Sequence, residues 1–447
     1  MNSTRYRLFL FNLISGRRRL LDDDEYHVLC KMCNSQTDYT SSKSEKELIE
    51  KLREERQFVT EEDRATIELK LKEMGHFSFN NWESNDLRFT VEITQNCNMK
   101  CSYCYIKTRT KSDAIMDKKY IDAIHSFYTR FSSKLSSINN TSIINITGGE
   151  TLINNESVDI INYIAKIWHR SKLVIFTNGI NILKYYDNLP LNSIKEVRVS
   201  LDGVKKIYIE GEYFINDDEC QNFDKIIAGI KKLLDNGVSV RIVTVLSKYN
   251  YKEYSNLISL LEREKISQMP NYIHEYDVVH DFTNDLDMDE SFNNVKDVFE
   301  IQEYLLQSHY GNKILFPSLS VLYRALSRPV GKLELPKHQR CSQQFLTNYY
   351  FSCDGNIYFC GFAKEGKGII GKYYPQVAVD NLAITTLANR SVTNNKRCWA
   401  CPYKFICLGG CPLTAAGGGL EMHCGVFAVD DVIDNLEFDY ESLLNNR

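Results

Sequence analysis

The sequence predicts an α/β protein with a partial (β/α)6, TIM-like barrel at its centre, a small N-terminal module and a cysteine-rich C-terminal part. Between residues 85 and 335, apolar runs typical of strands alternate with amphipathic runs typical of helices. Such alternation predicts a parallel sheet with crossover helices. About six units of this kind are present, fewer than the eight of a closed barrel, so the barrel should be open.

The predicted strands are short and largely apolar, as strands covered on both faces are. They span residues 88–94, 142–147, 172–177, 195–201, 238–246 and 271–278. The helical runs between them span residues 117–133, 156–169, 181–187, 222–236 and 251–265. Ligands of such folds bind at the carboxyl ends of the strands, so the residues that follow each strand are the candidates for ligand binding.

Three cysteines follow the first predicted strand at a C-x3-C-x2-C spacing: Cys97, Cys101 and Cys104. A loop of this length can direct three thiolates toward one point, and soft thiolates suit an iron–sulfur cluster. A cubane cluster has four iron corners, so three protein ligands would leave one iron open to a substrate or cofactor. Three buried cysteines or part of a zinc site are the alternatives, and the spacing favours the cluster.

The composition is that of a soluble globular protein, with 43% hydrophobic and 25% charged residues. A net charge of −4 argues against a dedicated nucleic-acid binder. No apolar run approaches the ~18 residues of a membrane span, and the N-terminus lacks the core of a signal peptide. We therefore expect a cytoplasmic protein without a membrane partner, whose fourteen cysteines serve metal binding rather than disulfides.

Residues 1–84 are predicted to form a separate module with a hairpin and three helices. An alternating run ends at a Ser15-Gly16 turn, and residues 18–21 resume an extended run, which indicates a hairpin. Helical runs follow, and Ser44 with Glu47 fits a capping box at the start of the second.

Seven cysteines within residues 336–447 have an ordered spacing that predicts metal binding. The pattern is C-x13-G-x4-C, then C-x2-C-x5-C-x3-C, then one last cysteine. Four thiolates at the spacing of the middle run also suit zinc, which is the alternative to further iron–sulfur clusters. The seven are Cys341, Cys360, Cys398, Cys401, Cys407, Cys411 and Cys424.

The first motif, with Tyr103 before its last cysteine, resembles that of the radical S-adenosylmethionine (SAM) enzymes. The C-terminal pattern resembles the SPASM domain, and together the two resemblances cover roughly residues 85–425. They imply S-adenosyl-L-methionine bound at the open iron of a [4Fe-4S] cluster, its reductive cleavage to a 5′-deoxyadenosyl radical, and two auxiliary [4Fe-4S] clusters. An electron donor such as flavodoxin or ferredoxin is also implied.

The N-terminal module resembles the winged-helix-like domain that recognises leader peptides in many peptide-modifying enzymes. That resemblance implies a precursor peptide as partner, whose leader would add a strand to the hairpin edge. A domain that only covers the barrel is the alternative.

Residues at the ends of the next three predicted strands are assigned to the cofactor by the same resemblance. Glycines let the backbone approach a ligand closely, and a carboxylate can accept from an ammonium. In the family, a Gly-Gly-Glu motif binds the methionine part and a serine contacts the ribose. With Tyr103 of the first motif, the corresponding residues are Gly148, Gly149, Glu150, Asn178, Ser200 and Asp202.

The sequence departs from the family at some cofactor positions. Thr151 stands where a proline usually follows the Gly-Gly-Glu motif. In sulfatase-maturing relatives an arginine about twelve residues after the serine reaches the cofactor carboxylate, and Glu212 stands at that spacing here. Arg241 on the next strand is a candidate substitute, with a surface role as the alternative.

The SPASM resemblance also implies a division of the C-terminal cysteines between two clusters. Cys353 lies in a hairpin where relatives more often have proline, and it is the candidate fourth ligand of the inner cluster. Otherwise that cluster has an open iron that could bind substrate. The outer set is Cys398, Cys401, Cys407 and Cys424, and the inner set is Cys341, Cys360 and Cys411.

Three other positions bear on the reaction. Gly361 follows Cys360 where anaerobic sulfatase maturases have an aspartate base. Cys220 begins the fourth crossover helix, where a thiol could return hydrogen to a substrate radical as in radical epimerases, although an incidental cysteine is the favoured interpretation. Cys30 and Cys33, without a second pair nearby, are interpreted as ordinary half-buried cysteines.

The expected function is that of a radical SAM maturase that forms a thioether, ether or carbon–carbon cross-link in a ribosomally made precursor peptide. Radical epimerisation of a peptide is the first alternative and sulfatase maturation the second. A non-catalytic electron-transfer protein with three clusters is a further alternative of another class. The residues at the cofactor positions argue against it.

Overall fold

The computed structural model describes most of the predicted barrel and several shorter stretches. The described residues are 8–11, 18–34, 42–55, 65, 69, 88–104, 106, 115–134, 143–210, 219–247, 249–278, 348–363, 368–401, 409 and 412. Most of the predicted third N-terminal helix lies outside these residues, as do Cys341, Cys407, Cys411 and Cys424.

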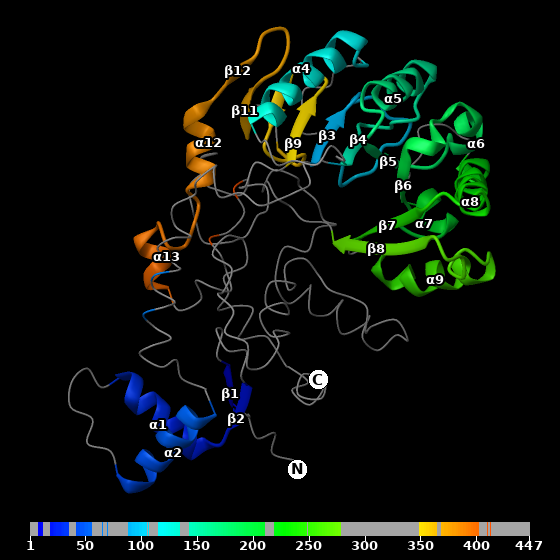
Figure 1. Ribbon diagram of the computed structural model, residues 1–447. Coiled ribbons are helices and arrows are strands. Elements are labelled where there is room, and N and C mark those ends of the chain that lie inside the picture. The colour runs from blue at the N-terminus through cyan, green and yellow to red at the C-terminus, as the bar shows by residue number, and fades with distance from the viewer. Residues whose placement is uncertain are drawn as a thin grey trace.

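Six parallel strands form the centre of the fold, which confirms the predicted βα repeat. They pair in chain order, and each neighbouring pair is parallel. The strands curve into an open arc in Figure 1, as a partial barrel does. They are β3 (Arg88–Glu92), β4 (Ile143–Thr147), β5 (Lys172–Thr177), β6 (Ile194–Ser200), β7 (Val240–Leu246) and β8 (Tyr272–Val278).

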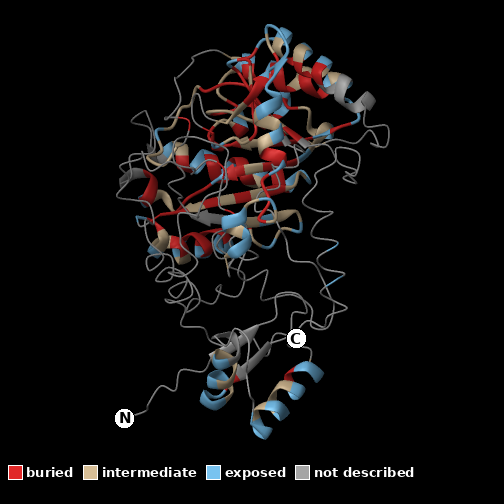
Figure 2. Ribbon diagram, turned by 90° about the vertical axis from the view of Figure 1, so that its left-hand side faces the viewer, coloured by how far each residue is buried: buried red, intermediate tan, exposed pale blue. Residues whose placement is uncertain are grey.

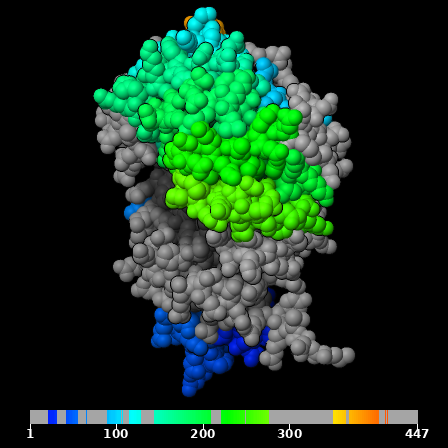
Figure 3. Space-filling view, turned by 90° about the vertical axis from the view of Figure 1, so that its right-hand side faces the viewer, coloured from blue at the N-terminus to red at the C-terminus, as the bar shows by residue number. Residues whose placement is uncertain are grey.

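Helices cover the convex side of this arc (Figure 1). In Figure 3 the green part of the chain, from α5 to α9, forms one continuous surface. The helix α7 was not predicted, because six residues are too few to display a helical period. The helices are α4 (Lys118–Lys134), α5 (Asn155–Ile167), α6 (Ile182–Tyr185), α7 (Lys205–Glu210), α8 (Glu219–Asp235) and α9 (Tyr254–Arg263), with 3-10 turns η3 (Tyr186–Asn188), η4 (Leu191–Ser193) and η5 (Tyr251–Glu253).

The two faces of the sheet differ in polarity. Phe89 and Val91 of β3 are buried with Ile121 of α4 in one apolar core, and Figure 2 shows buried residues gathered between strands and helices. Successive side chains of a strand point to opposite faces, so Thr90 and Glu92 line the inner face of the arc. The helices therefore supply the core, and the inner face is left for polar contacts.

The C-terminal part continues the same sheet, which the sequence did not predict. β9 (Asn348–Ser352) runs parallel to β3 on the side opposite β4, and Glu92 is level with Ser352. Three antiparallel strands extend the sheet beyond β9 and bring it to ten strands. They are β10 (Asn356–Tyr358), β11 (Ile369–Lys372) and β12 (Ala378–Val379), followed by α12 (Asn381–Ala388) and α13 (Lys396–Ala400).

The N-terminal hairpin and its first two helices are present as predicted. β1 (Leu8–Phe11) pairs antiparallel with β2 (Arg18–Leu21), and α1 (Asp23–Asn34) and α2 (Lys43–Glu54) follow. Both helices are largely exposed in Figure 2.

The predicted capping box of α2 was wrong by two residues. Ser42 is the N-cap, and its Oγ accepts from the backbone N of Glu45 at 3.3 Å. The Glu45 carboxylate in turn accepts from the Ser42 backbone N at 2.6 Å. Two overlapping Ser-x-x-Glu patterns fit the motif equally well, and the earlier one starts the helix.

Candidate active site

The loop that follows β3 is fastened to the end of β4 by backbone hydrogen bonds. The N–H of Gly149 donates to the carbonyl of Thr94 at 2.8 Å, and that of Glu150 donates to the carbonyl of Asn96 at 2.7 Å. A Cβ at Gly148 would lie 2.5 Å from the Thr94 carbonyl oxygen, and a Cβ at Gly149 would overlap the Asn96 carbonyl. Only glycine at both positions lets these two strand ends approach so closely.

The three thiols of the first motif lie on this loop and are half-buried. Burial, with the nearby Glu150 carboxylate, raises the pKa of Cys97 to about 12. The Cys97 sulfur accepts from the backbone N–H of Met99 at 3.4 Å. Within the residues that the structure describes, no three cysteine, histidine, aspartate or glutamate side chains are arranged to hold a metal ion.

Glu150 joins the ends of β4 and β5. Its carboxylate accepts from the Thr177 hydroxyl at 2.6 Å and from the backbone N–H of Asn178 at 2.6 Å and of Leu152 at 2.8 Å. Burial raises its pKa, and these three hydrogen bonds act in the opposite direction. The Asn178 amide in turn donates to Asn98 of the loop at 2.7 Å. Two predicted cofactor residues therefore also brace the loop that carries the cysteines.

Asp202, just beyond β6, is connected to the same loop. One carboxylate oxygen accepts from the Tyr103 hydroxyl, and the other accepts from the backbone N–H of Val245 at 2.8 Å. Burial raises the pKa of Asp202 to about 6 against the lowering effect of both hydrogen bonds. Ser200, the last residue of β6, is exposed. The residues predicted to contact the cofactor thus gather at the carboxyl ends of β3 to β6.

Arg241 is held on the inner face by two carboxylates. It donates to both oxygens of Glu196 at 3.0 Å and to Glu275 of β8 at 3.2 Å. Arg198 donates through Nε to the same Glu196 at 2.7 Å. These ion pairs already orient the half-buried guanidinium of Arg241, so the structure does not favour the prediction that it reaches the cofactor carboxylate. Glu212 lies outside the described residues.

Four C-terminal cysteines can be placed. Cys353 is buried in the same apolar core as Phe89, and Cys360 is half-buried against it. Cys398 lies in α13 and Cys401 directly follows it, and both are half-buried. The other predicted ligands lie outside the described residues, and nothing is described of the Cys220 side chain.

Glu92 is a functional candidate that the sequence analysis missed. It is fully buried on the inner face, and its carboxylate accepts from the hydroxyls of Tyr350 at 2.8 Å and Ser352 at 2.5 Å. The signal was the alternation of Thr90, Glu92 and Thr94 with apolar residues, which indicates a polar inner face. Its partners on β9 are more than 250 residues away, and no local pattern reveals them.

Residues 91–261 match the family model of the Radical SAM superfamily. The chain contains a radical SAM domain. The match begins in β3 and ends in α9, so it includes the three-cysteine loop and the strand ends described above. This assignment supports an enzyme that uses SAM radical chemistry, as the sequence predicts.

Curated relatives share this part of the chain. The GTP 3',8-cyclase of Clostridium perfringens strain SM101 is 30% identical over 184 residues, which is 39% of this chain and 52% of that protein. The GTP 3',8-cyclase of Petrotoga mobilis is 29% identical over 38% of this chain and 50% of that protein. The chain thus spans about half the length of these relatives.

Solved structures resemble the fold over a larger share of the chain. The protein anSMEcpe, with bound AdoMet and a Kp18Cys peptide, aligns with a TM-score of 0.57 at 17% identity, covering 80% of this chain and 98% of that one. Streptococcus suis SuiB, bound to its precursor peptide SuiA, aligns with a TM-score of 0.52 at 16% identity, covering 93% and 97%. The fold of this chain is therefore similar to that of anSMEcpe and SuiB over most of its length.

The residues of the loop suit the cluster and cofactor that this superfamily implies. Three half-buried thiols on one short loop match, in kind and number, the donors that a cluster with one open iron needs. The two glycines leave no side chain between the loop and β4, so backbone groups can approach a ligand there.

Proposed function

We propose that the protein is a radical SAM maturase that cross-links a ribosomally made precursor peptide. The observation that carries the proposal is the extent of its likeness to SuiB. Residues 85–447 make up about four-fifths of the chain, whereas the alignment with SuiB covers 93% of it. The likeness to a protein solved with its precursor peptide therefore extends into the N-terminal module.

Each part of the chain has a role in this proposal. Residues 1–84 form a winged-helix-like domain that binds the leader, residues 85–335 the radical SAM barrel, and residues 336–447 a SPASM domain with two auxiliary clusters. An edge of the two-stranded β1–β2 hairpin is the proposed site of leader binding, because an extended peptide can add a strand there. A cytoplasmic location and an electron donor such as flavodoxin or ferredoxin complete the proposal, and no described helix is long and apolar enough to cross a membrane.

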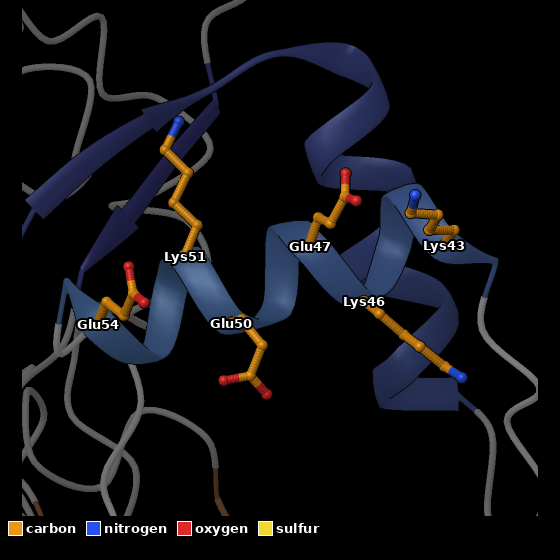
Figure 4. Close-up of a pocket in the computed structure, with 6 residues that line it drawn as sticks. All are labelled: Lys43, Lys46, Glu47, Glu50, Lys51 and Glu54. Carbon is orange, nitrogen blue, oxygen red and sulfur yellow. The ribbon is translucent and has the colours of Figure 1, made fainter.

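The hollow along α2 is a poorer candidate for the leader site. All its lining side chains come from one exposed helix and are lysines and glutamates, as Figure 4 shows. Opposite charges three or four residues apart on a helix partner one another in water, and they offer no apolar anchor for a peptide. The lining residues are Lys43, Lys46, Glu47, Glu50, Lys51 and Glu54.

Cys97, Cys101 and Cys104 would hold the radical SAM cluster, and the backbone at Gly148 and Gly149 would border the cofactor. When bound, the cluster and SAM would supply a carbon radical that takes one hydrogen atom from the substrate, and closing the new bond would release a proton and one electron, which an auxiliary cluster would accept. The protein contributes position: Glu150 and Asn178 fix the loop against β4 and β5, and Ser200 presents an exposed hydroxyl at the end of β6.

The surroundings of Gly361 argue against sulfatase maturation. A Cβ at this position would lie 2.7 Å from the ring of Tyr350. An aspartate base after Cys360 would therefore displace Tyr350, whose hydroxyl is bound to the buried Glu92. The space that such a base needs is filled by an aromatic ring, which favours peptide cross-linking over formylglycine formation.

The first test counts iron and measures reductive cleavage of SAM after anaerobic reconstitution. We expect about twelve irons per chain, because each of three clusters has four. In Cys97→Ala/Cys101→Ala/Cys104→Ala the count should fall to about eight and cleavage should cease. Cys30→Ala, which removes a half-buried thiol of α1 outside all three sets, is the control and should match the parent. About four irons with bound zinc would overturn the auxiliary clusters.

The product mass tests the modification itself. Co-expression with short peptides encoded beside the gene should give a product about two hydrogens lighter than its precursor, as one new bond requires. An unchanged mass with deuterium taken from the solvent would instead indicate epimerisation. Peptides unchanged in both mass and deuterium, despite active SAM cleavage, would contradict a peptide maturase of either kind.

A further inference from the structure

Asp202 is fixed at every polar atom of its backbone and side chain. Its backbone N–H donates to the hydroxyl of Tyr208 at 3.1 Å, and its carbonyl accepts from the Asn250 amide at 2.9 Å. The Asn250 amide also donates to the carbonyl of Val245 at 2.8 Å, and the Val245 N–H donates to the Asp202 carboxylate. With 3% of its surface exposed, Asp202 is a rigid acceptor built into the junction of β6 and β7.

Its other carboxylate oxygen accepts from Tyr103, the residue between two cysteines of the first motif. Tyr103 is half-buried and packs against the apolar core. Beside it, the Cys104 backbone N–H donates to the carbonyl of Cys101 at 3.3 Å, which closes a turn between the two cysteines. The Asp202–Tyr103 hydrogen bond therefore attaches this turn to a strand end that is about 100 residues away in sequence.

We propose that Asp202 is a positioning residue for the cysteine loop rather than a direct ligand of the cofactor. Both of its carboxylate oxygens already accept protein hydrogen bonds, and those to an ionised carboxylate are stronger than neutral ones. The bond to Tyr103 fixes the distance between the segment 101–104 and β6. That distance would set where Cys101 and Cys104 hold a cluster relative to Ser200, at the predicted cofactor site.

The loop is also attached to β4 and β5, at a different part of its length. The loop is bound to β4 through Gly149 and Glu150 and to β5 through Asn178, and these contacts hold its first half, residues 94–98. The hydrogen bond from Tyr103 adds a connection between the second half, residues 101–104, and the end of β6. Without it we expect Cys101 and Cys104 to shift by fractions of an ångström while Cys97 stays in place, and a misplacement of about 1 Å can cost ~100-fold in rate.

The proposal rests on the radical SAM domain and not on the identity of the peptide. Its tests therefore use SAM cleavage without peptide, so that failure of the maturase proposal leaves them interpretable. The variants are Tyr103→Phe, which removes only the donating hydroxyl, Asp202→Asn, and the double variant. Tyr163→Phe is the matched control, since the Tyr163 hydroxyl donates to Asp122 at 2.8 Å in another tyrosine–aspartate pair, between α5 and α4.

Hydrogen–deuterium exchange of the full-length protein gives a readout that is independent of activity. In Tyr103→Phe and Asp202→Asn we expect the amides of residues 101–104 to exchange at least several-fold faster than in the parent, with exchange in β5 unchanged. The reduced cluster should also show a smaller change of its electron paramagnetic resonance spectrum when SAM is added. Tyr163→Phe should match the parent in both respects.

The kinetic expectation is that each single variant keeps the parent's iron content and cleaves SAM about tenfold to a hundredfold more slowly. The double variant should be no slower than the worse single variant, because Tyr103→Phe removes the hydroxyl with which either side chain at position 202 would pair. Parent-like exchange, spectrum and rate in Tyr103→Phe would overturn the proposal. A fall in thermal stability of Tyr103→Phe, together with faster exchange throughout the barrel and not only at residues 101–104, would also overturn the proposal. The bond would then be a general packing contact.

Discussion

Gly149 is the residue at which backbone geometry most directly limits the site. A Cβ there would overlap the carbonyl oxygen of Asn96, the residue before Cys97, and a second carbonyl, that of Gln95, lies 2.5 Å away. Both obstacles are backbone atoms, so no side-chain rotation can relieve the overlap. A larger residue must displace the loop that carries the first thiol.

We therefore expect Gly149→Ala to bind SAM at least tenfold more weakly and to lose cleavage activity, because the loop moves away from β4. SAM binding by equilibrium dialysis and iron content after reconstitution measure the effect. Gly237→Ala is the control: nothing lies within 4 Å of a Cβ there, so only its positive φ of 76° is strained, at a cost of about 1 kcal/mol. Normal SAM binding in Gly149→Ala would show that the loop tolerates the shift.

The sequence was informative about residues whose chemistry is local and uninformative about those whose partners are remote. The spacing of Cys97, Cys101 and Cys104 and the glycines after β4 could be recognised within a few residues. The role of Arg241 could not, because its carboxylate partners lie on the neighbouring strands β6 and β8. Cross-strand partners depend on strand order and register, which one sequence without relatives does not specify.

The strands and helices of the barrel could also be predicted, because their signals are local in the sequence. Each strand from β3 to β7 is a short apolar run followed by a helical period, and every predicted range from β3 to β8 overlaps its strand. β9 was missed because nothing near residues 348–352 indicates pairing with β3, which precedes it by more than 250 residues. The buried Glu92 now explains how the two strands are held together on the inner face.

Glu92→Ala should destabilise the junction of β3 and β9 by about 3 kcal/mol or more, because it leaves the hydroxyls of Tyr350 and Ser352 buried without their acceptor. Denaturant unfolding of the parent, Glu92→Ala, Tyr350→Phe and the double variant gives a double-mutant cycle. A coupling energy above about 1 kcal/mol is expected for residues that share a buried hydrogen bond.

Asn145→Ala is the matched control on the same inner face. It removes one long hydrogen bond, 3.4 Å between the Asn145 amide and the Thr90 hydroxyl, and should cost less than about 1 kcal/mol. Additive effects of Glu92→Ala and Tyr350→Phe would mean that the carboxylate does not couple the two strands.

At the scale of the whole molecule, one sheet connects the radical SAM domain to the C-terminal strands. Its ten strands run from β12 to β8 without interruption. Among the described residues the parallel arc ends at β8, where Tyr254 of α9 lies beside His274, so β8 is the margin of the described barrel. β8 pairs with β7 over seven residues, and the backbone N–H of Val245 in β7 donates to Asp202 of the site. A loss of stability at β8 would therefore also affect the site.

His274 makes that margin sensitive to acid. Burial lowers its pKa from 6.5 to about 4. Its Nε2 lies 2.8 Å from the Thr244 hydroxyl, which itself donates to the Leu201 carbonyl, so the neutral ring donates through Nε2. The rings of Tyr254 and Tyr272 lie beside it, with centroids 5.7 and 6.3 Å away. No charged group among these neighbours favours the imidazolium.

The sign of the pH dependence follows from this depressed pKa. The unfolded chain takes up a proton at His274 below about pH 6.5, whereas the folded protein resists it until about pH 4. Stability contributed by the neutral ring is present above pH 6.5 and is lost as the pH falls toward 4. The shift corresponds to about 3 kcal/mol at most, and partial solvent exposure reduces it to about 1–3 kcal/mol.

His274→Gln should remove this part of the acid sensitivity, because glutamine keeps a donor for Thr244 and does not titrate. Thermal unfolding of the anaerobic holoprotein at pH 7.5 and pH 5 measures it: the parent should lose more stability between the two values than the variant. His169→Gln, the same change at an exposed position after α5, should behave like the parent. An equal loss in all three proteins would place the acid sensitivity elsewhere and leave β8 without a role in it.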